Sequence, residues 1–357
     1  MKTLPVTLVI PHRNRVEELR HCLRSLQIAK TTPEKVIVVD DFSCAEQQQL
    51  LPDILSEFKS LDIKIFCYGE HVGTSDAKNL GILKTQTPYI WFLDSDTQII
   101  NPNALEVGYE VLEKNSSIGV VGAEFVEDGN HQRYIRETYL LRSLWSAWIN
   151  HPVGNNIRKE VDCMPTCNFL SRTDLIKEIG GFHSQLVNGE DKLACLQIRE
   201  LGYRIFLDSR FEVLHCLSPV ERAEFLTRVR ITFRDVAFIY GATSSFLNLI
   251  VFHLNCLLSL KKLYSNNIEN YRLFYHNKDR FNAIPASGLL ELVKQLRDLG
   301  KLVAQYVLAN KTYMSLKGYY FRLITKNNPN KFQERTLNLT ERLTQLNYFR
   351  SYYTLEC

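Results

Sequence analysis

The feature that most constrains the fold of this 357-residue chain is an unbroken run of four β-branched residues, Val36, Ile37, Val38 and Val39. A strand with one face in water alternates apolar and polar residues. A continuous apolar run is instead typical of a strand that is buried on both faces of a parallel sheet. The run therefore predicts a sheet with a covering layer on each side.

Strand and helix patterns alternate through the first hundred residues. Strands are predicted at residues 6–10, 35–39, 63–67 and 89–93, and helical spacing separates them, most clearly at residues 75–84. This alternation predicts βαβ units. The expected fold class is α/β, with a mostly parallel, Rossmann-like sheet flanked by helices.

The middle of the chain adds further elements before the pattern changes. Helices are predicted at 174–179 and 190–201, and short strands at 205–207 and 211–214. From Val220 the sequence is helical in character and rich in Tyr and Leu. We therefore expect a catalytic domain over residues 1–219 and a helical C-terminal region over residues 220–357.

Polar side chains follow three of the predicted strands. In such sheets, ligands bind at the carboxyl ends of the strands. Several carboxylates facing one place would repel each other unless a cation or a hydrogen-bonding ligand lay between them. The residues concerned are Pro11, His12 and Arg13, then Asp40 and Asp41, then Asp94, Ser95 and Asp96.

The triplet Asp94-Ser95-Asp96 follows the apolar run 89–93 directly. Two carboxylates one residue apart at a turn can both reach one hard divalent cation, and Mg²⁺ and Mn²⁺ prefer such oxygen ligands. The alternative is a turn or a helix N-cap, because Asp and Ser favour both places. The triplet alone leaves these two interpretations open.

A second acidic motif, Gly189-Glu190-Asp191, precedes the predicted helix 190–201. Acidic residues at that position can simply complement the helix dipole. The motif gains weight from Gly180-Gly181-Phe182 before it and from His215 after it.

These motifs together resemble family 2 glycosyltransferases over roughly residues 6–215. The resemblance consists of ordered blocks: Val9-Ile10-Pro11 with Arg13-Asn14-Arg15, Val38-Val39-Asp40-Asp41-Phe42-Ser43, Ala77-Lys78-Asn79-Leu80-Gly81, Phe92-Leu93-Asp94-Ser95-Asp96, Gly180-Gly181-Phe182, Gly189-Glu190-Asp191 and Val213-Leu214-His215. It implies a GT-A fold and an inverting, single-displacement transfer from a nucleotide-diphosphate sugar.

The resemblance also implies a role for each matching residue. Asp41 would bind the donor's base, with Pro11, Arg13 and Asp40 beside it, and Asp94 and Ser95 would lie near the ribose or the sugar. Asp96 and His215 would hold Mg²⁺ or Mn²⁺, which would stabilise the charge that develops on the leaving diphosphate. Asp191 would be the general base, with Glu190 either raising its pKa or binding an acceptor hydroxyl.

The sequence departs from the family pattern in two places. Lys78 stands where relatives usually carry Arg, so the charge is kept but the fork geometry is lost, and its expected contact with the donor is in doubt. No Gln-x-x-Arg-Trp motif follows Asp191, which favours the transfer of a single sugar. We expect a UDP-sugar donor and a glycan or lipid-linked acceptor.

Two other function classes remain open. One is a nucleotidyltransferase that makes the activated sugar, although the first strand is not followed by the glycine-rich phosphate loop typical of such enzymes. The other is a non-catalytic protein of the same fold that binds a sugar nucleotide or a glycan. The presence of Asp94, Asp96, Asp191 and His215 counts against the second.

Several other residues are expected to be structural. His12 is predicted to be a surface loop histidine. Trp145 and Trp148, with neighbouring Tyr and Leu residues at 139–144, predict a buried helix, and an acceptor-facing or membrane-facing patch is the alternative.

Composition bears on partners and location. The formal net charge of +4 gives no reason to expect a nucleic-acid partner, and the nine scattered cysteines are read as free thiols in the cytosol. Residues 236–260 contain no Asp, Glu, Lys or Arg but are rather polar for a membrane span. Buried or interfacial helices are expected there, and peripheral attachment to the cytoplasmic face of a membrane would suit a lipid-linked acceptor.

Overall fold

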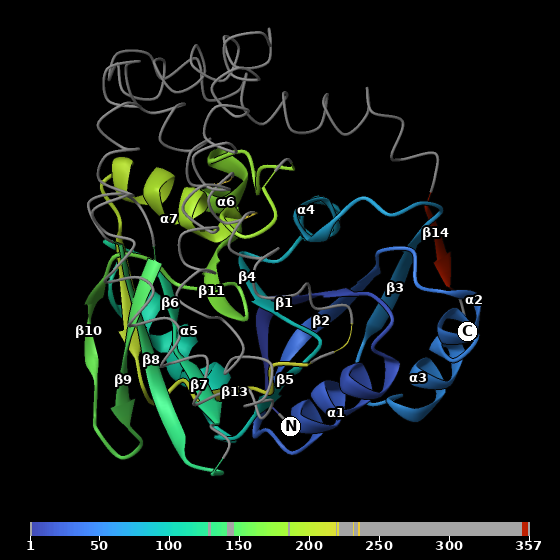
Figure 1. The fold of residues 1–357 in the computed structure, drawn as a ribbon, viewed down its shortest axis with the longest axis horizontal. Coiled ribbons are helices and arrows are strands. Elements are labelled where there is room, and N and C mark those ends of the chain that lie inside the picture. The colour runs from blue at the N-terminus through green and yellow to red at the C-terminus, as the bar shows by residue number, and fades with distance from the viewer. Residues whose placement is uncertain are drawn as a thin grey trace, which may run out of the picture.

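The computed structural model describes residues 2–127, 130–140, 146–184, 186–218, 220, 231, 235 and 352–355. Two sheets organise them (Figure 1). The larger has nine strands in the order β10-β12-β6-β11-β4-β1-β2-β3-β14. Its bounds are β1 Lys2–His12, β2 Thr31–Asp40, β3 Ile63–Tyr68, β4 Tyr89–Leu93, β6 Ile118–Gly122, β10 Arg158–Val161, β11 Asn168–Arg172, β12 Arg204–Asp208 and β14 Tyr352–Leu355.

The centre of the large sheet is parallel, as the alternating pattern predicts. Strands β3, β2, β1 and β4 run in one direction, and β11 then pairs antiparallel with β4. Because β1, β2 and β4 are parallel neighbours, their carboxyl ends share one edge of the sheet. The polar residues that follow these three strands are therefore brought to the same edge.

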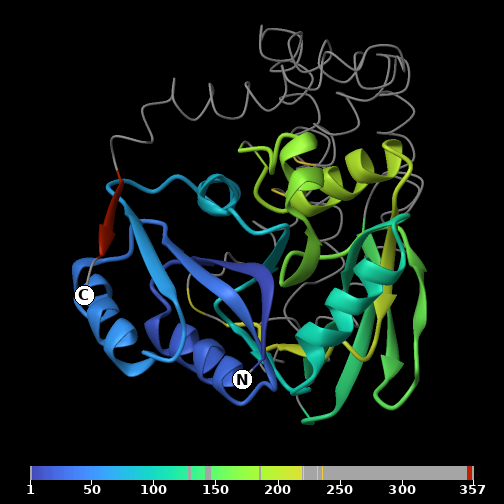
Figure 2. The same cartoon turned by 180° about the vertical axis from the view of Figure 1, so that it is seen from behind.

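Helices cover both faces of this sheet (Figures 1 and 2). Val36 and Val38 pack on the face covered by α1, α3 and α5, whereas Ile37 and Val39 pack on the face covered by α4, α6 and α7. This double burial is the physical reason for the continuous apolar run. The helices are α1 Val16–Gln27, α2 Ala45–Gln48, α3 Leu51–Glu57, α4 Thr74–Lys84, α5 Ala104–Lys114, α6 Thr173–Glu178 and α7 Glu190–Glu200.

A second sheet of five strands has the order β5-β13-β7-β8-β9. Its strands are β5 Thr97–Ile99, β7 Glu124–Glu127, β8 Arg133–Leu140, β9 Ser146–Pro152 and β13 Val213–His215. In its register His215 lies opposite Thr97 and beside Val126. Because β5 begins immediately after Asp96, this pairing brings a histidine from the end of β13 next to the acidic triplet.

The prediction of a helix around residues 139–148 is wrong. Tyr139 and Leu140 end strand β8 and Trp148 lies in strand β9, which pairs antiparallel with it. The pairing of two strands across a long hairpin overrides the local apolar spacing, which fits a strand nearly as well as a helix. Residues 141–145, which include Trp145, lie outside the described residues.

Most of the predicted C-terminal region, residues 220–357, lies outside the described residues, and so does the apolar segment 236–260. Its last described part is not helical: β14 extends the large sheet by pairing antiparallel with β3. Within the described part of the chain, no helix combines the length and apolarity that a membrane crossing requires.

Candidate active site

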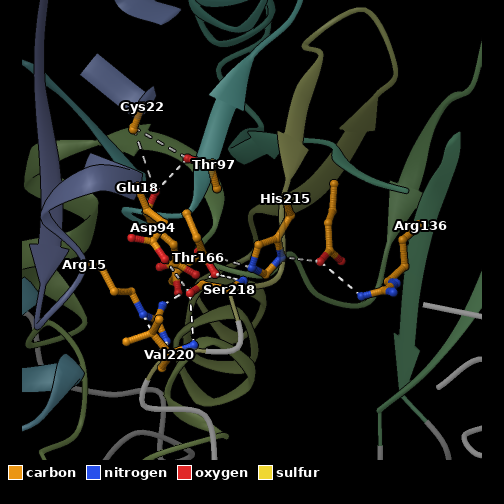
Figure 3. A network of polar contacts seen from close by, with 12 residues as sticks. Arg15, Glu18, Cys22, Asp94, Thr97, Arg136, Thr166, His215, Ser218 and Val220 are labelled. Atoms are coloured by element: carbon orange, nitrogen blue, oxygen red, sulfur yellow. Dashed lines mark hydrogen bonds and ion pairs between the residues drawn. The ribbon is translucent and has the colours of Figure 1, made fainter. Parts of the chain in front are cut away.

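The site is built around Asp94, Asp96 and His215, whose candidate ligand atoms all lie within 4.8 Å of one another. The two carboxylates come from the turn after β4, and the imidazole comes from β13. Nε2 of His215 lies 3.5 Å from Oδ1 of Asp96. Figure 3 shows Asp94, His215 and Arg15 converging from three separate elements. The turn or N-cap alternative for the triplet does not account for the imidazole that faces it.

Asp96 is buried and is held in place by groups on two other segments. The amide of Ser218 donates to its Oδ2 at 2.8 Å, and Nη1 of Arg15 lies 3.4 Å from the same oxygen. Arg15 also donates from Nη2 to the carbonyl of Val220 at 2.6 Å. Asp96 thus joins the end of β4 to the start of α1 and to the chain that follows His215.

His215 is oriented by Glu124, which begins strand β7. Nδ1 of His215 lies 2.8 Å from Oε1 of Glu124, and Nη1 of Arg136 donates to that same oxygen at 3.1 Å. Burial alone would lower the pKa of His215, but the neighbouring Cys167 and Asp96 raise it well above its ordinary value. A position that favours a proton so strongly has a negative potential, which favours a cation as well.

The donor set fits a divalent ion. Two carboxylates and an imidazole converge, and the imidazole carries the carboxylate partner on its far nitrogen that metal-binding histidines usually have. With the Nδ1 proton directed to Glu124, Nε2 faces Asp96 and would be the nitrogen that binds an ion in place of its own proton. These residues therefore suit Mg²⁺ or Mn²⁺.

The second acidic motif starts helix α7 and lies in the electrostatic field of the first. Nζ of Lys78 donates to Oε1 of Glu190 at 3.1 Å and also to the hydroxyl of Thr166. Burial, which Lys78 offsets only in part, raises the pKa of Glu190 to about 7. The pKa of Asp191 is also raised, first by burial and then by the negative charge of Asp94. A raised pKa is the property that a carboxylate base requires.

Lys78 belongs to α4, and its side chain contacts Glu190 of α7 and Thr166. Its side chain is 1% exposed. Burial alone would lower its pKa, but Glu190 and Asp94 keep it raised and the ammonium charged. The contact of Lys78 with the substrate stays a prediction.

Asp41 follows β2 and forms the centre of a second polar group at the same edge. Its carboxylate accepts the amides of Val72 at 2.7 Å and Gly73 at 3.0 Å, and Nδ1 of His71 lies 2.9 Å from Oδ2. Burial raises the pKa of Asp41, against the effect of these contacts and of the nearby Arg13. Strand β1 separates β2 from β4, so the two polar groups lie about 10 Å apart by strand spacing.

Asp40 and Pro11 are buried where the parallel strands β2 and β1 end. Asp40 accepts hydrogen bonds from the hydroxyl and amide of Ser43 and, at 3.0 Å, from Nε2 of Gln48. These contacts close the turn after β2. The expected contacts of Asp40, Pro11 and Ser95 with the donor stay predictions.

Comparisons with known proteins identify the family of the domain that carries this site. The model of the family "Glycosyl transferase family 2" matches residues 7–180. The chain contains a family 2 glycosyltransferase domain. The match covers β1 to α6 and so includes the acidic triplet, whereas Glu190, Asp191 and His215 follow it.

The family 2 domain has relatives of diverse function. It is 26% identical over 207 residues to glycosyltransferase AglE of Haloferax volcanii, covering 57% of this chain and 64% of AglE. It is 26% identical over 172 residues to a teichoic acid poly(glycerol phosphate) polymerase of Staphylococcus epidermidis, covering 48% of this chain and 22% of the polymerase. The chain thus spans less than two thirds of the length of these relatives.

The fold of the family 2 domain is GT-A. A mannosyltransferase from Pyrobaculum calidifontis, solved with GDP-Man and Mn²⁺, superposes with a TM-score of 0.52, covering 92% of this chain and 88% of that protein. At 14% identity this likeness establishes the fold alone.

The prediction that His12 is a surface loop residue is wrong. His12 ends strand β1 and is 2% exposed, and neither ring nitrogen has a hydrogen-bond partner within the described part of the chain. Its Nε2 lies 3.8 Å from Oδ1 of Asp40. Burial lowers the pKa of His12 to about 4, although Asp40 and Glu18 act against that shift and Arg15 adds to it. The strand continues two residues past the apolar run, and this extension buries the imidazole.

We therefore expect His12 to make the native state acid-labile. In the unfolded chain His12 takes up a proton as the pH falls below about 6.5, but in the native state it stays neutral down to about 4. Stability is consequently lost over this window, by about 2–3 kcal/mol for this group between pH 7 and pH 4.5. Urea unfolding of wild type and His12→Leu at both pH values measures it: the variant should lack this loss. His21→Leu, on the exposed side of α1, is the control, and an equal pH response of both variants would contradict the assignment.

Sequence reasoning gave no role to Arg15, Glu124, Thr166 or Ser218, which contact the site residues directly. Arg15 lies in one of the family blocks, so its position was available without its partner. Glu124, Thr166 and Ser218 belong to no motif. Only the packing of the two sheets places them near the acidic residues.

The cysteines behave as the sequence predicts. Those in the described residues are free: Cys22, Cys44, Cys67, Cys163, Cys167, Cys195 and Cys216. Burial raises the pKa of Cys167 to about 12 despite its contact with His215.

Proposed function

We propose that this chain is an inverting, metal-dependent glycosyltransferase that moves one sugar from a nucleotide-diphosphate donor to a hydroxyl acceptor. The observation that carries the proposal is the convergence of Asp94, Asp96 and His215 within 4.8 Å, next to a motif whose Asp191 has a raised pKa. Such a site can neutralise a leaving diphosphate on one side and remove a proton on the other.

Asp96 and His215 would hold Mg²⁺ or Mn²⁺, with Asp94 beside them. A bound divalent ion supplies positive charge to the phosphate oxygens as the leaving group departs. Arg15 and the amide of Ser218 keep the Asp96 carboxylate in position, and Glu124 keeps the His215 ring in position.

Asp41, with Arg13 and Pro11, would bind the base of the donor. The separation of about 10 Å between Asp41 and the acidic triplet, by strand spacing, suits a nucleotide that extends from its base to its diphosphate. A UDP-sugar is the favoured donor. The solved structure of similar fold that contains GDP-Man supports a nucleotide-sugar donor without fixing the nucleotide.

Asp191 would take the proton of the acceptor hydroxyl. The acceptor oxygen attacks the anomeric carbon on the face opposite the leaving diphosphate, whose bond to the sugar breaks, and this single displacement gives inversion. Burial and the negative charge of Asp94 keep the pKa of Asp191 raised against the effect of Lys192 and Lys78, which strengthens it as a base. Glu190, fixed by Lys78, would orient an acceptor hydroxyl.

The acceptor is proposed to be a glycan or a lipid-linked hydroxyl. We propose that residues 1–219 form the catalytic domain and that residues 220–357 contribute to the acceptor or membrane contact. A location in the cytoplasm, with peripheral attachment to the inner face of the membrane, would bring the enzyme to a lipid-linked acceptor.

A panel of nucleotide sugars tests the proposal. Release of nucleoside diphosphate from one donor should require Mn²⁺ or Mg²⁺ and should stop on addition of EDTA. Formation of a nucleotide sugar from a nucleoside triphosphate and a sugar phosphate would instead favour a nucleotidyltransferase. Metal-independent binding without turnover, whatever the acceptor, would favour a non-catalytic binding protein.

A further inference from the structure

The carboxylate of Asp235, in the C-terminal region, contacts the segment that leads to the proposed base. Asp235 is fully buried, and its Oδ2 accepts the amide of Val187 at 2.7 Å and the amide of Asn188 at 2.8 Å. These two residues immediately precede Gly189, the N-cap of α7, and Asp191 follows in the first turn of that helix. The contacts join parts of the chain that are 47 and 48 residues apart.

The start of α7 needs such an external contact. Its N-cap, Gly189, provides no side-chain hydrogen bond. Two bonds from consecutive amides to one oxygen fix the orientation of the peptide between them, and bonds to an ionised acceptor are about twice as strong as neutral ones. Asp235 therefore sets the direction in which the chain enters the helix.

Helix α4 also contacts this segment. The hydroxyl of Ser75 donates to the carbonyl of Leu186 at 2.9 Å, and Lys78 holds Glu190. Asp235 thus adds contacts from the C-terminal region to those that α4 makes with residues 186–191.

The chain that leads into the C-terminal region also reaches the proposed metal ligand. Ser218, near the end of the proposed catalytic domain, donates to Asp96, and the carbonyl of Val220 accepts from Arg15. Contacts of Ser218, Val220 and Asp235 therefore connect this part of the chain to both halves of the proposed reaction centre.

We infer that Asp235 is a positioning residue for Asp191, acting through the amides of Val187 and Asn188. The inference rests on the proposed function, because it assumes that Asp191 is the base. A base works only within hydrogen-bond reach of the acceptor proton, and a misplacement of about 1 Å can cost about 10²-fold in rate.

Two variants of Asp235 test this role. Asp235→Leu removes the acceptor, so kcat should fall by about 10–10²-fold while the KM for the donor and the affinity for Mn²⁺ stay near their wild-type values. Asp235→Asn keeps an oxygen that can accept both bonds, and most of kcat should be retained. Hydrogen exchange should become faster at the amides of Val187 and Asn188 in the Leu variant and much less so in the Asn variant.

Asp208→Asn is the control for general loss of stability. Asp208 is also buried and accepts a backbone amide, that of Arg210, but it ends strand β12. Its variant should melt at a lower temperature without a selective fall in kcat or faster exchange at residues 187 and 188. Wild-type kcat in Asp235→Leu, or equal losses in the Leu and Asn variants, would overturn the inference alone. A wild-type protein that turns over no donor would overturn the proposed function, and this inference with it.

Discussion

Asp191→Asn is expected to lower kcat for sugar transfer by about 10²–10⁴-fold, the usual contribution of a general base. Asparagine keeps the size of the side chain, and its oxygen can still accept the backbone N–H of Lys192, whose nitrogen lies 2.7 Å from Oδ1 of Asp191. It cannot take a proton from the acceptor. The KM for the donor and the dependence on Mn²⁺ should therefore stay close to those of the wild type, because both belong to the other side of the reaction centre.

The measurement is a steady-state assay of transfer with both substrates varied, together with a thermal melt. Asp174→Asn is a matched control, since Asp174 lies in the first turn of the neighbouring helix α6 and is exposed. Full turnover by purified Asp191→Asn would refute the assignment of the base. A loss shared by both variants would point to a general effect of first-turn charge on the helices.

The second large effect is expected for Asp96→Asn, which should reduce kcat/KM for the donor by about 10³-fold. A bound metal contributes several kcal/mol to catalysis of this kind, and each factor of ten corresponds to about 1.4 kcal/mol. The asparagine oxygen can still accept from the amide of Ser218. The fold should therefore persist while one charged ligand is lost, and higher Mn²⁺ should restore part of the rate.

Titration of the rate with Mn²⁺ distinguishes this result from a simple loss of folded protein. Asp53→Asn, on an exposed position of α3, should leave the titration unchanged. An Asp96→Asn enzyme with the wild-type Mn²⁺ dependence would show that this carboxylate does not hold the ion. In that case the approach of His215 to Asp96 at 3.5 Å would be an ion pair of structural value only.

The central framework of this fold was predictable from the sequence because it depends on local patterns. The strand predicted at residues 89–93 is found as β4 Tyr89–Leu93, and the helix predicted from residue 190 is found as α7 Glu190–Glu200. Apolar runs and helical spacing reflect which faces of an element are buried, and that property is written within a few consecutive residues. The acidic residues after β4 could likewise be placed at the ligand-binding edge, since parallel strands end together.

The second sheet was less predictable. Residues 139–148 have apolar spacing that suits a helix, yet Tyr139 and Leu140 lie in β8 and Trp148 lies in β9, which pairs with β8. Strand formation depends on packing against the paired strand, and the local apolar spacing does not report that pairing. The same limit applies to His12, whose burial follows from two additional residues at the end of β1.

The sequence by itself determined the α/β class, the resemblance to family 2 and the positions of the acidic motifs, because periodicity and short motifs are local properties. Only the tertiary structure decided which groups support those motifs. Glu124 contacts His215, Lys78 contacts Glu190, and Asp235 contacts the residues that lead into α7. The two partners of each contact lie far apart in the chain. The physical reason is that a buried polar group must find its partner across the packed interior, and spacing along the chain does not specify that partner.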